Sequence, residues 1–167
     1  MTASSLFSLF NIAALAGWIA LAASVVMNSP MLRDRLSGQW LPVLFSMAYT
    51  ALILLFFLDA PGGFGSLDDV QLLFTSPWVA LAGWLHYLAF DLWIGARIAR
   101  ESAELKLPRW PLIILLPLTF LFGPAGFLAF ETIKAARKVS TSRTDFPVFC
   151  VYDCTASFIF APSLKTY

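Results

Sequence analysis

The sequence predicts an all-α integral membrane protein, a bundle of four transmembrane helices. Hydrophobic residues make up 59% of the 167 residues and charged residues only 13%, whereas a soluble domain is about half apolar and a quarter charged. The mean hydropathy is +0.78. The chain also contains four long apolar segments, each close to the roughly 20 residues needed to cross a hydrocarbon core. These observations together predict a chain embedded in the lipid bilayer.

The first apolar segment, residues 5–27, carries no charged side chain. Ala22-Ala23-Ser24 near its end is similar to a cleavage site, so a secretory signal peptide is an alternative to a membrane helix. However, no lysine or arginine precedes the segment, and its apolar run exceeds the roughly 7–15 residues of a signal-peptide core. Both features favour a transmembrane helix.

The second segment, residues 40–58, begins with Trp40, a residue type that is enriched at membrane interfaces. Its Pro42 is tolerated because it falls in the first turn of the predicted helix. The third segment, residues 77–99, is apolar and aromatic but includes the only histidine of the chain, His86.

The fourth segment, residues 111–130, is apolar throughout but contains Pro117 and then Gly123-Pro124. Proline removes a backbone donor and clashes with the preceding turn. We therefore expect this helix to be kinked or broken at Gly123-Pro124.

The connections between the segments differ in charge. Those at residues 28–39 and 100–110 carry arginine and lysine, whereas the one at residues 59–76 carries only aspartate. Because positive charge concentrates on the cytoplasmic side, this pattern places the first and third connections in the cytoplasm and both termini outside.

The end of the fourth segment disagrees with that orientation. Four full crossings would leave three basic residues on the outer side, namely Lys134, Arg137 and Lys138. Alternatively, the fourth segment turns back at Phe122-Gly123-Pro124 instead of crossing. Re-entrant backbone must be buried in protein, and the chain is small, so we favour the full crossing.

Polar side chains in the third segment are the main candidates for function. A charge at mid-bilayer costs about 2.5–3.5 kcal/mol on insertion scales and usually faces a bundle interior or a cavity. At about 100° per residue, one inward-facing arc can hold His86, Tyr87 and Asp91, although His86 and Asp91 lie about 7.5 Å apart along the axis. The structural alternative is that His86 bonds a neighbouring helix and that Asp91 pairs with Arg97 or Arg100.

The arc also needs a partner that is not lipid. A break in the fourth segment frees backbone carbonyls and removes side-chain bulk, and each unsatisfied polar group in hydrocarbon costs several kcal/mol. We therefore expect His86, Tyr87 and Asp91 to pack toward residues 122–126, with a small polar cavity or ordered water between them and aromatic walls around it.

Two stretches then resemble a known family. HYLAFDL at residues 86–92 and LFGPAG at residues 121–126 are similar to the signature of the abscisic-acid-deficient-four-like membrane proteins, and the likeness extends over about residues 6–137. The resemblance implies a compact multi-helix membrane protein. In plants, members are associated with forming neoxanthin from violaxanthin, a rearrangement of a carotenoid epoxide.

Two functional classes remain open. In the first, the protein acts on a carotenoid or related isoprenoid, with Asp91 as base and His86 or Tyr87 as acid. The residues expected to hold such a substrate are Trp84, Phe90, Trp93, Phe122, Gly123, Pro124 and Gly126. In the second class, the protein binds a lipid, pigment or protein partner without catalysis, and His86 and Asp91 are structural.

Several other classes are excluded by the sequence. One histidine and one aspartate at this spacing give too few ligands for a metal, and no nucleotide or haem motif indicates a cofactor. A net charge of +1 without a long basic block gives no footprint for nucleic acid.

The absence of a transit peptide rich in serine and arginine indicates a bacterial plasma-membrane protein.

We divide the chain into a four-helix membrane domain, residues 1–138, and an irregular C-terminal tail, residues 139–167. The tail contains Cys150 and Cys154, which are four residues apart. They lack the further ligands that a zinc site requires.

Overall fold

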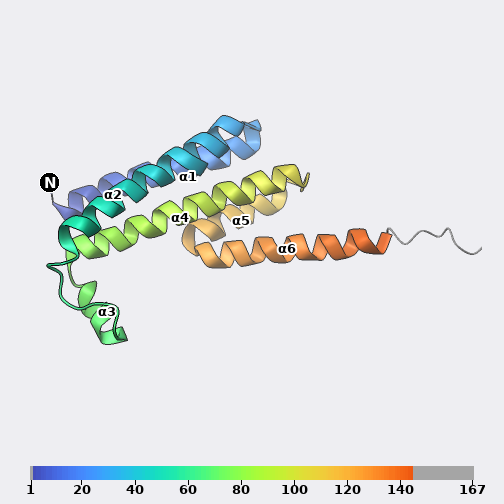
Figure 1. Cartoon of the computed structure of the whole chain (residues 1–167). Coiled ribbons are helices and arrows are strands. Elements are labelled where there is room, and N and C mark those ends of the chain that lie inside the picture. The colour runs from blue at the N-terminus through green and yellow to red at the C-terminus, as the bar shows by residue number, and fades with distance from the viewer. Residues whose placement is uncertain (1, 145–167) are drawn as a thin grey trace, which may run out of the picture. The chain divides into compact units, whose positions relative to one another are not determined.

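The structure is a computed structural model that describes residues 2–144 (Figure 1). The chain divides into two compact units, Met1–Glu131 and Thr132–Tyr167. The described residues form helices and no strand, which confirms the all-α class. In order, the elements are α1 (Ala3–Met27), η1 (Met31–Trp40), α2 (Leu41–Phe56), α3 (Leu67–Leu73), α4 (Pro77–Glu104), α5 (Trp110–Leu121) and α6 (Gly123–Thr144).

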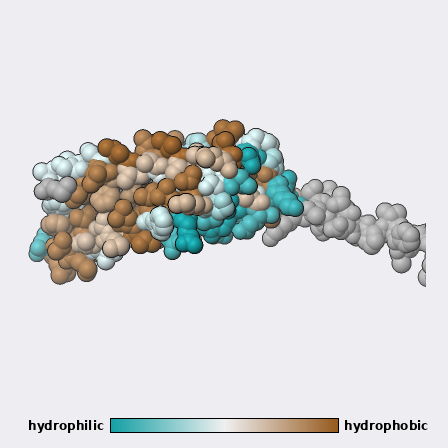
Figure 2. Space-filling view, turned by 90° about the horizontal axis from the view of Figure 1, so that it is seen from above, coloured by the Kyte–Doolittle hydropathy of each residue, from teal (hydrophilic) through white to brown (hydrophobic). Residues whose placement is uncertain are grey.

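Within the described part of the chain, three helical stretches are long and apolar enough to cross a membrane: Ala3–Met27, Met31–Phe56 and Pro77–Glu104. The count of four crossings is not confirmed, because α5 has only 12 residues. Many large apolar side chains on these helices are exposed, and Figure 2 shows them over much of the visible surface. A surface of this kind is stable in lipid rather than in water.

Helix α4 lies at the centre of the first unit, because it contacts α1, η1, α2 and α5. Small residues let its neighbours approach closely. A side chain at Gly17 of α1 would overlap Leu92 of α4, and a side chain at Gly95 of α4 would overlap the Trp18 ring of α1. Glycine at such positions is typical of packed membrane helices.

The first connection, expected to be a loop, is helical instead. Residues Met31–Trp40 form η1, a π-helix in which each turn is wider than in an α-helix, and Leu41 donates its N–H to the carbonyl of Leu36, five residues back. Ser37 is fully buried and its hydroxyl donates to the carbonyl of Gly17 at 3.0 Å. The hydrogen bond from Ser37 to α1 explains why this connection is helical although its polar residues predict a loop.

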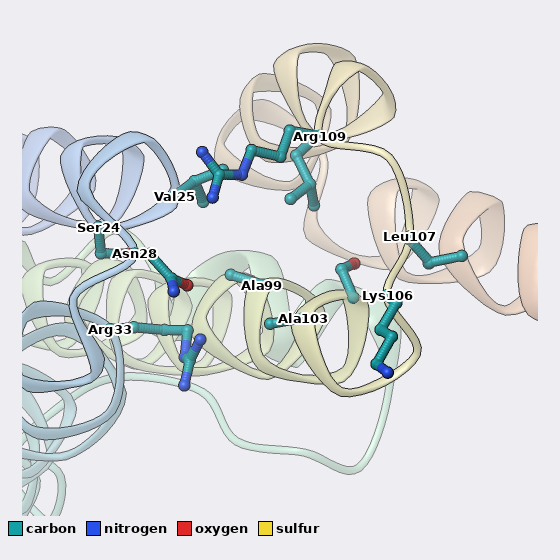
Figure 3. Close-up of a pocket in the computed structure, with 11 residues that line it drawn as sticks. Ser24, Val25, Asn28, Arg33, Ala99, Ala103, Lys106, Leu107 and Arg109 are labelled. Carbon is teal, nitrogen blue, oxygen red and sulfur yellow. The ribbon is translucent and has the colours of Figure 1, made fainter.

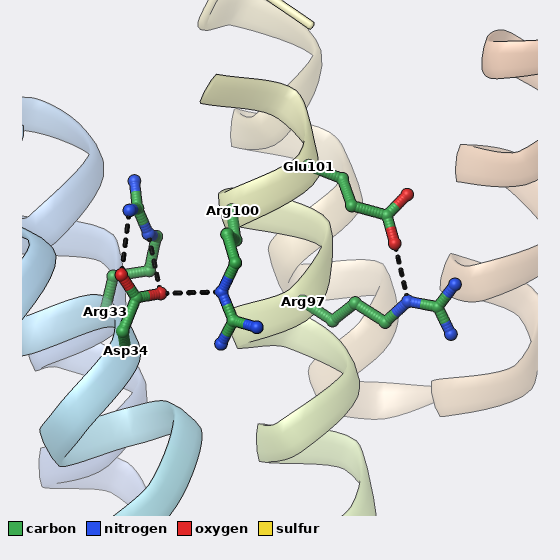
Figure 4. A network of polar contacts seen from close by, with 5 residues as sticks. All are labelled: Arg33, Asp34, Arg97, Arg100 and Glu101. Atoms are coloured by element: carbon green, nitrogen blue, oxygen red, sulfur yellow. Dashed lines mark hydrogen bonds and ion pairs between the residues drawn. The ribbon is translucent and has the colours of Figure 1, made fainter. Parts of the chain in front are cut away.

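An ion-pair network ties η1 to α4 (Figure 4). Asp34 accepts two hydrogen bonds from Arg33, at 3.0 and 2.9 Å, and one from Arg100 of α4 at 2.8 Å. Arg97 pairs separately with Glu101 at 2.6 Å. These pairs are partly exposed, so their worth in stability is about 0–1 kcal/mol each. The Arg100–Asp34 pair, which joins the two helices, fixes their register.

The connection between α2 and α4 contains the short helix α3, whose first turn is capped. Ser66 accepts a hydrogen bond from the N–H of Asp69 at 3.1 Å and donates to its carboxylate at 2.8 Å. Gly62 has a φ of +84°, and a side chain there would overlap the carbonyl of Asp69. The loop shape therefore depends on glycine at this position.

The acidic connection should lie outside the cytoplasm. The charge pattern predicts that Gly63→Cys, in a chain whose Cys150 and Cys154 are replaced by serine, reacts with an impermeant maleimide on intact cells. A side chain at Gly63 meets open space, so the variant should fold normally, whereas Ser66 caps α3 and is a poorer site. The matched variant Arg35→Cys should react only after permeabilisation. The reverse pattern would overturn the orientation.

The fourth apolar segment is broken where the sequence predicts. Helix α5 ends at Leu121, Phe122 adopts φ −144° and ψ 62°, and α6 starts at Gly123. Figure 1 shows the chain turning back at this point. A side chain at Gly126 would overlap both the backbone and the hydroxyl of Thr119 in α5, so the two helices meet in a tight hairpin. A chain that turns back at Phe122 is compatible with the re-entrant alternative.

Helix α6 continues to Thr144, past the boundary expected at residue 138. No glycine or proline interrupts residues 132–144, so nothing in that stretch stops a helix. Residues 145–167, which include Cys150 and Cys154, lie outside the described residues.

Candidate functional site

Asp91 of α4 is the most deeply buried carboxylate of the first unit, with 5% of its surface exposed. It lies against Gly123, the first residue of α6, and a side chain at Gly123 would overlap the carboxyl group. Within residues 2–144, its Oδ2 atom has no hydrogen-bond partner. A buried acceptor without a partner costs free energy, which makes this carboxylate a candidate for a functional role.

The helix break supplies a reason for the position of Asp91. The N-terminus of a helix carries partial positive charge from its aligned peptide dipoles. Asp91 lies beside the N-terminus of α6, so the dipole of α6 offsets part of the cost of burying a carboxyl group. The same geometry permits a purely structural role, in which Asp91 caps α6 from a neighbouring helix.

Tyr87 closes the other side of the break. Its hydroxyl donates to the carbonyls of Phe120 and Leu121, at 3.0 and 2.9 Å. In a continuous helix the carbonyl of Phe120 would bond the N–H of residue 124, but Pro124 has none. The Ala125 N–H bonds Phe122 instead of Leu121. Tyr87 therefore shares its single O–H between the two acceptors that the break leaves free.

Tyr87 and Asp91 lie one turn apart on α4, and their polar groups interact. Thus two of the three polar residues pack against the 122–126 break as expected. The alternative that Asp91 pairs with Arg97 or Arg100 is wrong, because these arginines bond Glu101 and Asp34.

His86 does not join this group. It is exposed, and its ring contacts Tyr49 of α2 and Phe90 of α4, with ring centres 5.5 and 4.7 Å apart. His86 and Asp91 are about 140° apart around the helix axis, so the arc is too wide for one face to bury both. The expectation that His86 faces the break is therefore wrong.

Trp18 of α1 was not among the site residues predicted from the sequence. Its ring packs on Gly95 and contacts Phe120, with centres 5.3 Å apart. Its indole Nε1 is buried and has no acceptor among the described residues. The Phe120 carbonyl also accepts a hydrogen bond from Tyr87. Contacts through Phe120 therefore connect the unpaired donor of Trp18 with the Tyr87–Asp91 pair. A tryptophan in an apolar helix carries no sequence signal that separates this role from core packing.

The expected substrate-binding residues lie on different faces. Trp84 stacks on Tyr87 at 5.2 Å and donates to Asn11 of α1 at 2.7 Å. Phe90 and Trp93 line an open groove of about 320 Å³ between α4 and the η1–α2 stretch. The remaining lining residues are Gly38, Gln39, Pro42, Val43, Ser46 and Ala89.

The residues of the break divide into a buried and an exposed set. Gly123 and Gly126 are buried against α4 and α5, whereas Phe122 and Pro124 are exposed. The Asp91 carboxylate is therefore covered by the tip of a short hairpin. For metal binding, residues 2–144 contain no group of three histidine, cysteine or acidic side chains.

The arrangement brings a buried carboxylate and a phenol one helical turn apart on α4, and such a pair of groups is typical of acid–base chemistry. A family model described as ABA DEFICIENT 4-like matches residues 5–130. No curated protein and no solved structure matches the chain. The match includes α4, the break and every candidate site residue. The chain belongs to the ABA DEFICIENT 4-like family.

Proposed function

We propose that this membrane protein isomerises a carotenoid epoxide or a related isoprenoid, with Asp91 as the proton acceptor and Tyr87 as the proton donor. The observation that carries the proposal is the buried Asp91 carboxylate with its unpartnered Oδ2, one helical turn from the Tyr87 hydroxyl. The relation to the neoxanthin-forming proteins supplies the substrate class.

The chemistry needs no further reactant. When an epoxide opens to an alcohol, its oxygen gains one proton as a C–O bond breaks. A carbon of the same molecule loses one proton, and the released electron pair forms a new carbon–carbon double bond. Substrate and product have the same composition, so one acid and one base are sufficient.

Tyr87 suits the role of acid better than His86. Its hydroxyl already lies at the break, where it exchanges one carbonyl acceptor for the substrate oxygen. The His86 ring lies on the side of α4 that faces Tyr49.

The test is conversion of violaxanthin to neoxanthin by the full chain in a host that makes violaxanthin, measured by chromatography. Neoxanthin should appear only when the chain is expressed. Unchanged pigment in cells that hold a normal amount of protein would contradict the proposal.

Variants of the two candidate acids should separate them. Tyr87→Phe should lower conversion by about 100-fold or more, the usual loss when a general acid is removed, and His86→Gln should change it less than about threefold. Because Tyr87→Phe also frees two carbonyls, the amount of membrane protein is measured for each variant. A large loss in His86→Gln alone would reverse the assignment.

A noncatalytic pigment-binding protein is the second candidate. It is favoured by the position of Asp91 beside the start of α6, where a carboxylate suits a purely structural role, and by the separation of the aromatic groove from it. In that case a carotenoid should purify with the protein chemically unchanged, and its yield should fall in Phe90→Ala and Trp93→Ala.

A further inference from the structure

A second pocket lies at the end of the first unit where α1 and α4 end and where η1 and α5 begin (Figure 3). Its volume is about 300 Å³. The cationic lining residues are Arg33, Lys106 and Arg109, and no acidic residue lines it. The proposed reaction does not use this pocket.

The three cations differ in what already balances them. Arg33 is paired with Asp34, so its charge is largely matched. Lys106 and Arg109 are exposed and take part in no ion pair that joins described residues. Arg109 only donates to the carbonyl of Val26 at 3.3 Å. The pocket therefore presents about two unmatched positive charges.

An independent observation also indicates a ligand. Ser102 of α4 lines the pocket, is 2% exposed, and its hydroxyl has no hydrogen-bond partner in the described chain. Buried hydroxyls normally have a partner. The Ser24 hydroxyl, which also lines the pocket, donates to Leu21 at 2.6 Å and makes no hydrogen bond with Ser102. The pocket is open to an acceptor for the Ser102 hydroxyl.

The helix ends around the pocket do not oppose an anion strongly. Carbonyls at helix C-termini carry partial negative charge, but the last carbonyls of α4 are bonded by the N–H groups of Leu105, Lys106 and Leu107. Helix α5 begins here at Trp110 without a side-chain cap, and its N-terminus favours negative charge.

The position of the pocket selects the source of the anion. It lies at the end of the helices that carries the basic connections, which the charge pattern places at the cytoplasmic face. Its lining also includes apolar side chains, those of Val25, Leu107 and Leu112. A ligand that is anionic at one end and apolar at the other fits this lining, and anionic phospholipids concentrate in the cytoplasmic leaflet.

We propose that this pocket binds the phosphate group of an anionic membrane phospholipid, with Lys106 and Arg109 pairing with the phosphate and the Ser102 hydroxyl donating to one of its oxygens. The acyl chains leave along the apolar lining residues. The bound lipid joins α1, α4 and α5 at one membrane face.

The experiment is native mass spectrometry of the full chain in detergent, titrated with phosphatidylglycerol or phosphatidylcholine. The double variant Lys106→Asn, Arg109→Gln should bind phosphatidylglycerol roughly twentyfold more weakly, at about 1 kcal/mol per basic residue. Asparagine suits Lys106, whose φ of +51° lies in the left-handed region. Ser102→Ala should weaken binding by about fivefold, without changing the net charge.

The matched control is Arg35→Gln, which removes an exposed positive charge from η1 outside the pocket and should leave the affinity unchanged. Equal weakening in Arg35→Gln, no weakening in the double variant, or equal affinity for phosphatidylcholine would overturn the proposal. So would tighter binding of glycerol 3-phosphate than of the lipid, which would assign the pocket to a soluble phosphate. The thermal stability of each variant in detergent is measured beside its affinity, so that a loss of binding caused by unfolding is recognised.

Discussion

Asp91→Asn should reduce conversion of the carotenoid epoxide by about 100-fold or more while the protein stays in the membrane at a near normal amount. Asparagine has almost the same size as aspartate and still accepts hydrogen bonds, so the contact with the start of α6 survives. It cannot accept a proton at neutral pH, and removal of a general base typically costs 10²–10⁴-fold in rate. Product per unit of membrane protein is the quantity to measure.

The matched control is Asp68→Asn, because Asp68 is an exposed carboxylate in the first turn of α3. It should leave conversion unchanged. If Asp91→Asn instead removes the protein from the membrane, the carboxylate has a structural role. That result would favour the noncatalytic pigment-binding protein. Normal conversion by Asp91→Asn would show that Asp91 is not the base.

The break in the fourth segment was predictable because it has a local cause. Pro124 removes one donor wherever the segment lies, and two glycines beside it lower the cost of leaving the helix. The direction of the chain after the break was not predictable, because it depends on Gly126 packing against Thr119, a contact between two helices.

The polar arc was predictable only in part. Helical periodicity placed His86, Tyr87 and Asp91 within one arc but gave no absolute direction for its centre. Packing decides that direction, since Gly95 receives Trp18 and Gly123 receives Asp91, and His86 is then turned outward. The helix in the first connection was even less predictable from the sequence. It depends on the hydrogen bond between Ser37 and Gly17, which are 20 positions apart.

Gly123→Ala should lower the thermal stability of the protein in detergent by several degrees, because the new methyl group would overlap the Asp91 carboxyl group. Overpacking a well-filled site costs about 1–3 kcal/mol, and a chain of this size loses about 2–4 °C per kcal/mol. Alanine favours a helix more than glycine does, so any loss of stability must come from the contact. Gly63→Ala, where the methyl group meets open space, is the matched control.

The double variant Gly123→Ala, Asp91→Ala isolates that contact. Removing the carboxyl group gives the new methyl group room, so the second substitution should cost less stability in the Gly123→Ala protein than in the wild type. A coupling of about 0.5–3 kcal/mol is typical for residues in direct contact. Strict additivity would mean that Asp91 does not lie against the start of α6, and the geometry on which both its chemical and its structural role depend would then be wrong.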